Sequence, residues 1–267
     1  MDNITVEKYG GDSPYEVQVR TDIGGRLEQQ DSAYLYTSPG MAFALVCDGM
    51  GGTDNGALAG RLAVDSMQML LKKYLTQQPR CTPPEFLLDA LVELDSLISC
   101  ELGQWKGGTT AVAAFLVCDN FYWASAGDSR LYIFRGGELV QATRDHNYFL
   151  RLHEQLKSGE ISQVQFDQEA ERGEALISYL GVGGLSVYDL TNAPLKLRNG
   201  DILLLTTDGL YKAIPQKLIR HILCSGESLE TMADKLIAQI TVLKQSVVLD
   251  NTTFALIRVN TEGIANE

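Results

Sequence analysis

Hydrophobic and polar positions change their period several times along the chain. Residues 15–20 alternate between the two kinds and residues 41–47 form an apolar run, which predicts two β-strands. From position 56 to Tyr74 apolar residues recur at helical spacing, and a second helix is expected after Thr82-Pro83-Pro84. Further strands are expected at 33–36, 110–117, 121–125, 131–135, 202–206 and 254–259, and a helix over 229–243. Short antiparallel strands after a helix pair favour α+β layers over alternating βαβ units.

Residues 147–180 interrupt this pattern. They are polar, helical in propensity and weakly patterned, so we expect an insertion that forms a flap subdomain. The length of 267 residues lies within the range of one large domain. We therefore expect a single domain over residues 1–267, with the flap inside it.

The charge and the apolar runs narrow the classes of partner. A net charge of −12 would repel a phosphate backbone or an anionic lipid surface, which disfavours a general nucleic-acid or membrane role. The longest apolar run, residues 41–47, is too short to span a bilayer, and the first residues lack the pattern of an export signal.

The five cysteines indicate a reducing compartment. Their number is odd and none forms a Cys-x-x-Cys pair, so we expect reduced thiols and a cytoplasmic location. Cys47 and Cys118 lie in strand-like runs, where we expect buried thiols. Three histidines are too few for a histidine-rich zinc site.

Three aspartates stand in turns directly after apolar runs. Asp48 precedes Gly49, Asp208 precedes a glycine, and Asp250 precedes Asn251. A strand that ends in Asp-Gly presents a carboxylate at a sheet edge, and the glycine lets the backbone come close to whatever the carboxylate holds. Each aspartate alone is more typical of an ordinary turn. Together they predict an oxygen-rich site for Mn²⁺ or Mg²⁺.

Seven short motifs follow one another between residues 20 and 259. They are Gly24-Gly25-Arg26 with Asp31-Ser32, Asp48-Gly49-Met50-Gly51-Gly52, Gly108-Thr109-Thr110, Gly127-Asp128-Ser129-Arg130, Thr143-Arg144-Asp145-His146, Thr207-Asp208-Gly209 and Asp250-Asn251-Thr252. In this order they resemble the metal-dependent Ser/Thr protein phosphatase family, type 2C, in its bacterial form. The resemblance implies a four-layer α-β-β-α sandwich, with two antiparallel sheets flanked by helix pairs. It also implies an enzyme in which a hydroxide bridging two divalent metals hydrolyses phosphoserine and phosphothreonine.

The resemblance also implies roles for particular residues. Asp48 would bridge the two ions, and the Gly49 carbonyl would bind the second. Asp208 and Asp250 would hold the first ion. The remaining roles fall to Asp31, which would orient water, to Arg26, which would clamp the phosphate, and to Asp128, which would bind a third metal. Arg20 is the alternative to Arg26, and Asp128 could instead order a turn with Arg130. His146 is interpreted as structural.

Three positions depart from the family pattern. Gln30 replaces a carboxylate near the second metal, so we expect weaker binding of that ion. Lys212 stands where many relatives carry an acidic ligand, so we expect a third site that is poorly formed or filled by the lysine. Met50 replaces a histidine proposed as general acid in animal members, as in bacterial relatives.

The expected partners are phosphorylated proteins and an opposing Ser/Thr kinase in signalling, and the expected state is a monomer. Gln30 and Lys212 leave open an alternative, a pseudophosphatase that binds phosphoproteins or regulates with little turnover. A different metal hydrolase on the same sandwich is a third interpretation.

Overall fold

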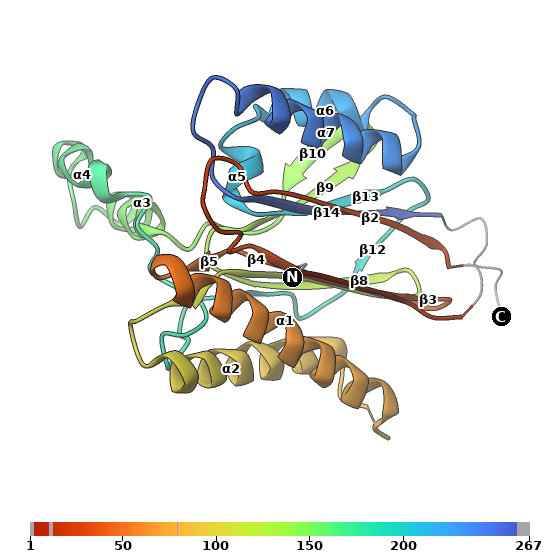
Figure 1. The fold of residues 1–267 in the computed structure, drawn as a ribbon. Helices are drawn as coiled ribbons and strands as arrows, with labels where there is room; N and C mark the ends of the chain where they lie inside the picture. Colours follow the sequence, from red (N-terminus) through yellow and green to blue (C-terminus); the bar gives the residue numbers. More distant parts are fainter. Residues whose placement is uncertain (1–2, 11–12, 79, 261–267) are drawn as a thin grey trace.

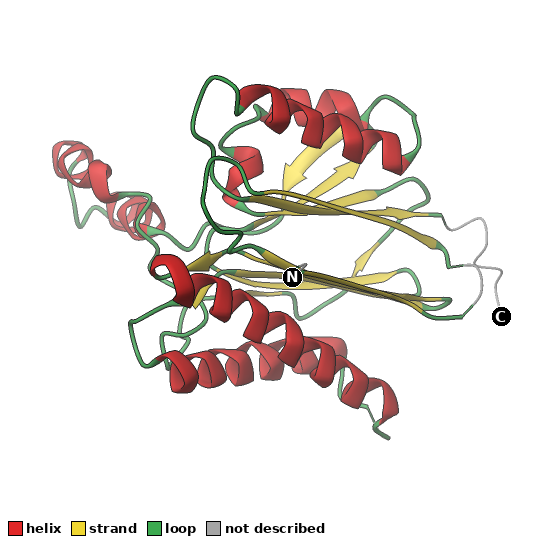
Figure 2. Cartoon of the chain, viewed as in Figure 1, coloured by secondary structure: helices red, strands yellow, loops and turns green. Residues whose placement is uncertain are grey.

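The computed structural model describes residues 3–10, 13–78 and 80–260. Two β-sheets face each other and a helical layer covers each outer face (Figures 1 and 2). The strands are β1 Ile4–Lys8, β2 Tyr15–Asp22, β3 Ser32–Ser38, β4 Met41–Cys47, β5 Gly49–Met50, β6 Gly108–Thr109, β7 Ala111–Val117, β8 Asn120–Ala126, β9 Arg130–Arg135, β10 Glu138–Gln141, β11 Asp189–Leu190, β12 Leu195–Lys196, β13 Ile202–Thr206 and β14 Thr252–Val259. The helices are α1 Gly52–Thr76, α2 Pro83–Leu102, α3 Tyr148–Ser158, α4 Gln163–Glu169, α5 Asp208–Tyr211, α6 Gln216–Leu223 and α7 Leu229–Leu243.

The two sheets have simple strand orders. The first runs β1-β3-β4-β7-β8-β11, with β12 also paired to β8, and the second runs β10-β9-β13-β14-β2. Neighbouring strands are antiparallel except β1, which lies parallel to β3 at the sheet edge. The expected α+β sandwich is confirmed, with one parallel strand added at its edge.

Three apolar clusters hold the four layers together. Phe43, Phe86 and Phe115 belong to the cluster between α1, α2 and the first sheet. A second cluster fills the space between the sheets, and a third packs the outer face of the second sheet on α6 and α7. Alternate residues of β13 divide between these clusters: Leu203 faces the other sheet and Leu204 faces the helices. This alternation follows from the period of two in a strand.

Most predicted elements are confirmed, and the starts of two helices show which signals in the sequence mark a helix boundary. α2 begins at Pro83, where Thr82 and Glu85 form a capping box and proline needs no hydrogen-bond partner. α1 begins at Gly52, earlier than expected, because apolar spacing marks only the turns that pack on the sheet. The sequence pattern did not predict the edge strand β1, the strands β10, β11 and β12, or the short helices α5 and α6.

The flap segment projects from one end of the sandwich. Residues 147–180 carry α3, α4 and a 3₁₀ turn at Ala170–Arg172, and α3 and α4 lie away from the two sheets (Figure 1). The segment that follows is anchored at α2. There the buried Asp95 carboxylate accepts backbone N–H bonds from Gly181 and Gly184 at 2.8 and 2.7 Å, and from two neighbouring residues. This anchor fixes the return of the flap to the core.

The expectations for cysteines and membrane segments have mixed outcomes. All five cysteines are free, and Cys47 is buried as expected. The expectation for Cys118 is wrong, because this residue lies in the exposed turn after β7 with a φ of 54°. Within the described ranges, no helix combines the length and apolarity needed to cross a membrane.

Candidate metal centre

The strand register brings the predicted carboxylates to one end of the sandwich. In the first sheet Ser32 pairs with Cys47, so Asp31 and Asp48 both lie just beyond the paired strand ends. In the second sheet Thr206 pairs with both Arg130 and Phe254, which places Asp208 close to the end of β14 that follows Asp250. This is the end of the molecule where α5 lies (Figure 1). The motifs converge because antiparallel strands alternate direction.

Asp48 and Gly49 are held by the strand that begins at residue 111. The Asp48 backbone N–H donates to Thr110 Oγ1 at 2.9 Å, and its carbonyl accepts from the Thr110 N–H at 2.8 Å. A Cβ atom at Gly49 would lie 2.2 Å from the carbonyl oxygen of Gly56, so no other residue fits there. The backbone at Asp48-Gly49 is therefore rigidly placed at the sheet edge.

Asp208 and Asp250 each form an ion pair with a basic side chain. Asp208 begins α5, and its Oδ2 lies 2.9 Å from Lys212 Nζ. Asp250 Oδ1 accepts the Asn251 N–H at 2.8 Å, and its Oδ2 accepts from Arg26 Nη2 at 2.6 Å. The Asp250 carboxylate raises the pKa of Arg26. Arg26 thus stands at the rim of the carboxylate cluster, whereas Arg20 pairs with Asp234 at the surface.

Asp31 lies deepest in the group, with 1% of its surface exposed. Its Oδ2 accepts a hydrogen bond from Thr207 Oγ1 at 3.0 Å. Burial raises its pKa to about 7, against hydrogen bonds from Thr207 and Thr253 that lower it. The hydrogen bond from Thr207 thus holds one oxygen of the Asp31 carboxylate in place. The other oxygen, Oδ1, is buried and has no hydrogen-bond partner, which indicates that it binds a further ligand.

Asp128, Lys212 and Glu174 form a second cluster at the cavity wall. Lys212 Nζ lies 3.9 Å from Asp128 Oδ2 and 3.3 Å from Glu174 Oε2. Burial and the Asp208 carboxylate raise the pKa of Asp128 to about 6, whereas Lys212 lowers it. Asp128 does not pair with Arg130, which bonds Asp145 instead at 2.6 Å. The ammonium of Lys212 therefore faces three carboxylates.

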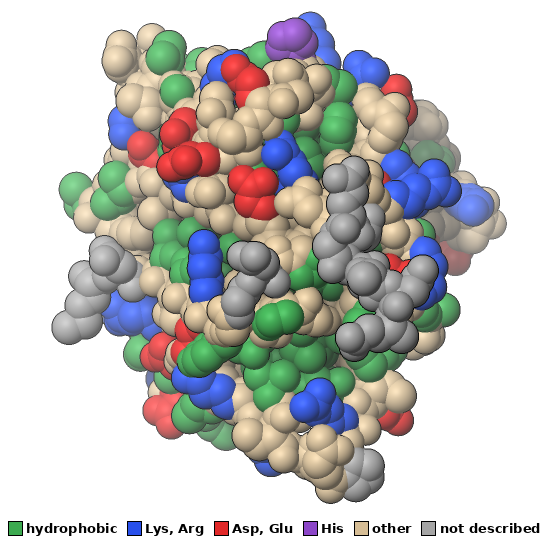
Figure 3. Space-filling model, turned by 90° about the vertical axis from the view of Figure 1, so that its right-hand side faces the viewer, with side chains coloured by type: hydrophobic (Ala, Val, Ile, Leu, Met, Phe, Trp, Pro, Cys, Tyr) green, Lys and Arg blue, Asp and Glu red, His purple; other side chains and the backbone are tan. Residues whose placement is uncertain are grey.

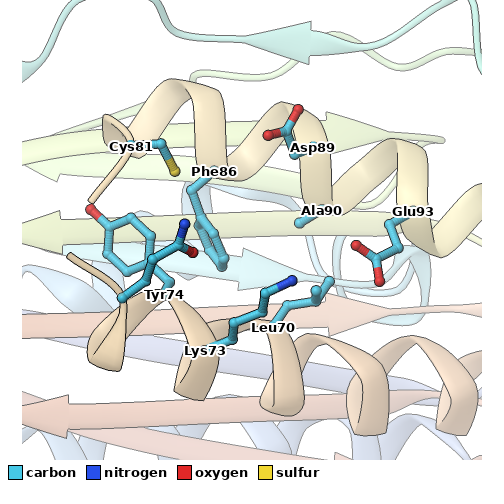
Figure 4. A pocket seen from close by; sticks show the side chains of 9 residues that line it. Leu70, Lys73, Tyr74, Cys81, Phe86, Asp89, Ala90 and Glu93 are labelled. Carbon is cyan, nitrogen blue, oxygen red and sulfur yellow. The ribbon is translucent and has the colours of Figure 1, made fainter. Parts of the chain in front are cut away.

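One cavity of about 350 Å³ is lined by Arg26, Asp48, Gly49, Asp128, Asp208, Lys212 and Asp250, whereas Asp31 does not line it. Its lining includes Gln30, Met50, Thr110 and Asn251, and Glu174 from the flap segment. A smaller cavity of about 120 Å³ lies between α1 and α2 and includes Cys81 and Tyr74 (Figure 4). The opposite end of the sandwich shows both acidic and basic side chains (Figure 3).

The donor set fits divalent cations. Buried oxygens of Asp31 and Asp208 have no hydrogen-bond partner, and carboxylates are the ligands that Mn²⁺ and Mg²⁺ prefer. Burial raises the pKa of Asp48 well above its usual range, and the carboxylates of Asp31 and Asp208 add to this. Such mutual repulsion is what a bound cation relieves.

Two basic side chains already pair with the proposed ligands. Arg26 binds an oxygen of Asp250 and Lys212 binds an oxygen of Asp208, so a cation at these oxygens would compete with both ion pairs. In the described part of the chain, no three His, Cys, Asp or Glu side chains are grouped as a metal cluster. Metal binding would loosen these two pairs.

Several residues of the site escaped sequence reasoning. Thr110 and Thr207 position Asp48 and Asp31, and Asn251 Oδ1 accepts the Gln30 N–H at 2.9 Å. The motifs named above include Thr110, Thr207 and Asn251, but the sequence alone did not assign these contacts to them. Glu174 carried no signal, because its approach depends on how the flap folds back. His146 is fully buried and its Nδ1 accepts the Gly127 N–H, as expected of a structural residue.

Comparison with known proteins decides the family. A family model described as protein phosphatase 2C matches residues 26–152. A Ser/Thr phosphatase, stp, of Listeria welshimeri is 31% identical over 222 residues, which cover 82% of each chain. The chain belongs to the protein phosphatase 2C family. As a member, it is a metal-dependent protein-serine/threonine phosphatase.

Other relatives align with nearly the whole length of this protein phosphatase 2C chain. The protein phosphatase PhpP of Streptococcus pneumoniae is 28% identical and covers 92% of this chain and 98% of its own. The solved catalytic domain of the phosphatase PstP, in complex with two manganese ions, is 25% identical with a TM-score of 0.71. That alignment covers 91% of this chain and 97% of the PstP chain. The predicted fold, enzyme class and divalent-metal cofactor of this phosphatase are confirmed.

Substituting Asp48 should make the metal-free phosphatase more stable. We expect Asp48→Asn to raise the free energy of unfolding in EDTA by about 1–3 kcal/mol, because it removes a charge from a group of carboxylates that repel one another. Excess Mn²⁺ should then stabilise the variant far less than the wild type. Thermal melts with EDTA and with Mn²⁺ measure both effects, and Asp65→Asn on the exposed face of α1 is the matched control. A lower melting temperature of Asp48→Asn in EDTA would contradict the argument.

Proposed function

We propose that this chain hydrolyses phosphoserine and phosphothreonine in proteins at the cavity lined by Asp48, Asp208 and Asp250. Two Mn²⁺ or Mg²⁺ ions, when bound, would supply Lewis acidity and a bridging hydroxide as the nucleophile. The observation that carries the proposal is the meeting of these three carboxylates with the Arg26 guanidinium in one cavity. The chain needs no covalent nucleophile of its own for such a reaction.

The residues of the cavity would have different roles in the reaction. Asp48, Asp208, Asp250 and the Gly49 carbonyl would hold the ions, and Asp31 would orient the water around them. Arg26 would place the phosphate, because its planar guanidinium matches two phosphate oxygens. Met50 lines the cavity but carries no ionisable proton, and we propose that water protonates the leaving oxygen.

The proposed substrate class can be tested directly. We expect Mn²⁺-dependent phosphate release from phosphoserine and phosphothreonine peptides, and none in EDTA. A phosphotyrosine peptide of the same sequence is the matched control. Equal release from all three peptides, or release that EDTA does not reduce, would contradict the proposal.

A second candidate function is a pseudophosphatase that binds a phosphoprotein with little turnover. Lys212 favours it, because its ammonium binds Asp208, one of the proposed ligands of the first ion. The chain nevertheless keeps Asp48, Asp208 and Asp250 in one cavity, which favours turnover. Binding of a phosphopeptide without phosphate release at saturating Mn²⁺ would decide for the pseudophosphatase.

Substitution of Gln30 tests how tightly the second metal ion binds. Its side chain approaches the backbone at the start of α1, since a Cβ at Gly56 would lie 2.9 Å from Gln30 Oε1. An amide adds no charge to hold a cation, so we expect Gln30→Glu to tighten the weaker Mn²⁺ site about fivefold to tenfold. Isothermal titration with Mn²⁺ measures this affinity. Gln77→Glu, at an exposed position directly after α1, is the matched control. Unchanged affinity and turnover in Gln30→Glu would refute the expectation.

Lys212 provides a test of the third metal ion. Its ammonium stands 2.9 Å from Asp208 and faces Asp128 and Glu174, where it would compete with a cation. We expect the wild type to bind two Mn²⁺ ions at moderate concentration and Lys212→Asp to bind one more. Metal analysis after equilibrium dialysis measures the stoichiometry. A third ion in the wild type that Asp128→Asn removes would contradict this prediction.

We also propose a domain organisation and a cellular location for the enzyme. We propose one phosphatase domain over residues 1–267 in which the flap of residues 147–180 shapes access for protein substrates. Glu174 supports this, because it brings the flap segment to the cavity wall. The ends of that domain lie outside the described residues. The proposed setting is a bacterial cytoplasm, where a monomer would act against a Ser/Thr kinase in signalling.

A further inference from the structure

A second cavity adjoins the one that holds the carboxylates. It measures about 640 Å³ and lies between residues 25–30 and 248–251. It shares Arg26, Gln30, Asp250 and Asn251 with the metal-centre cavity, so the two spaces are neighbours. We call this space the Leu27 groove, after the residue that follows the phosphate-binding Arg26.

The Leu27 groove presents two aliphatic side chains to solvent. Leu27 is 99% exposed and Val248 is 83% exposed, the two highest values among the large hydrophobic residues of the described chain. Both line the groove, on opposite loops. Single exposed hydrophobic residues are common, but a pair beside a catalytic cavity is typical of a binding surface.

The two loops that carry these side chains are fixed to one another. The Gly25 N–H donates to the Leu249 carbonyl at 2.8 Å, and Asn251 Nδ2 donates to the carbonyls of Ile23 and Glu28 at 2.9 and 3.1 Å. A Cβ at Gly25 would lie 2.8 Å from Val248 Cγ1 and 3.4 Å from Val248 Cα, so the two loops pass close to one another. Figure 1 shows the loop before β3 beside the loop that leads from α7 to β14. The groove is therefore preformed.

We propose that the Leu27 groove binds an aliphatic side chain of the phosphoprotein substrate, close in sequence to the phosphorylated residue. This inference rests on the proposed function, since it takes the phosphate to lie at Arg26. An extended peptide advances about 3.3–3.6 Å per residue, so a side chain one to three positions from the phosphorylated residue reaches the groove. Glu28 and Asp250 also line it, and their carboxylates would repel an acidic side chain.

The test uses the full chain and a peptide series. Each peptide carries one phosphothreonine in a serine background, with leucine placed singly at each of the three positions on either side. The measured quantity is the ratio of kcat/KM for each leucine peptide to that of the all-serine peptide, with Mn²⁺ present. For at least one position we expect a ratio of about five, the size expected for partial burial of one aliphatic side chain. Leu27→Ser and Val248→Ser should both bring that ratio close to one.

Matched variants and peptides separate the possible results. Val242→Ser on α7 removes a valine that is 62% exposed and lies outside the groove, and it should leave the ratio unchanged. Equal rates for all peptides in the wild type would overturn the inference and leave the proposed function intact. A preference for arginine over leucine at the same position would also overturn it, since Glu28 would then dominate recognition. No release from any peptide would overturn both the inference and the proposed function.

Discussion

Asp208→Asn should lower kcat/KM for an aryl phosphate by about a thousandfold, which corresponds to about 4 kcal/mol of lost transition-state stabilisation. Asp208 stands at the start of α5 with one buried oxygen unpartnered, and asparagine keeps its shape while removing its charge. A neutral amide is a poorer ligand for a hard cation than a carboxylate. Steady-state kinetics over a range of Mn²⁺ concentrations measure the loss, and excess Mn²⁺ should restore only part of the activity.

Two controls separate this result from a folding defect. Asp65→Asn makes the same chemical change at an exposed position on α1 and should leave kcat/KM within twofold, which corresponds to about 0.4 kcal/mol. The melting temperature of Asp208→Asn in EDTA should stay close to that of the wild type, because the variant loses its ion pair with Lys212 but also loses repulsion from Asp48. An active Asp208→Asn protein would mean that Asp208 is not a metal ligand.

Arg26→Ala should lower kcat/KM by about a hundredfold, mainly by raising KM. Hydrogen bonds to a charged group contribute about 1.5–3 kcal/mol, and the guanidinium can make two of them to one phosphate. In the structure Arg26 pairs with Asp250 and is 57% exposed, so it can turn toward a substrate without unfolding its loop. Arg26→Lys should recover only part of the loss, because an ammonium is a point charge without the planar fork.

Arg20 supplies the matched control for this experiment. It is the other arginine of the same region, yet it binds Asp234 on α7 at the surface and does not line the cavity. Arg20→Ala should therefore leave KM for phosphopeptides unchanged. If Arg20→Ala raises KM and Arg26→Ala does not, the assignment of the phosphate clamp is reversed.

The sequence predicted those parts of the site that depend on local chemistry. An aspartate before a glycine at the end of an apolar run is visible without a structure, and so is the helix start at Thr82. The order of the predicted strands and helices favoured α+β layers, whereas the four-layer sandwich was implied by the resemblance to the type 2C phosphatase family. The edge strand β1 was missed, because five residues near the start of the chain carry too little pattern to register.

The rest of the site depends on contacts between distant segments. Thr207 bonds Asp31 across 176 positions of sequence, and Glu174 reaches the cavity only because the flap returns past Asp95. Lys212 was noticed as a departure from a motif, but its three carboxylate neighbours could be found only in space. The exposure of Leu27 and Val248 is likewise a property of the packed loops.

The most direct test of the account locates the ions. Crystals of the wild-type chain grown with Mn²⁺ and measured at the manganese absorption edge would show each ion by its anomalous signal. We expect two peaks, with Asp48 between them. Asp208 and Asp250 should lie at the first peak, and the Gly49 carbonyl should lie at the second. Peaks that avoid Asp48 and lie only at Asp128 and Glu174, or none at saturating Mn²⁺, would contradict it.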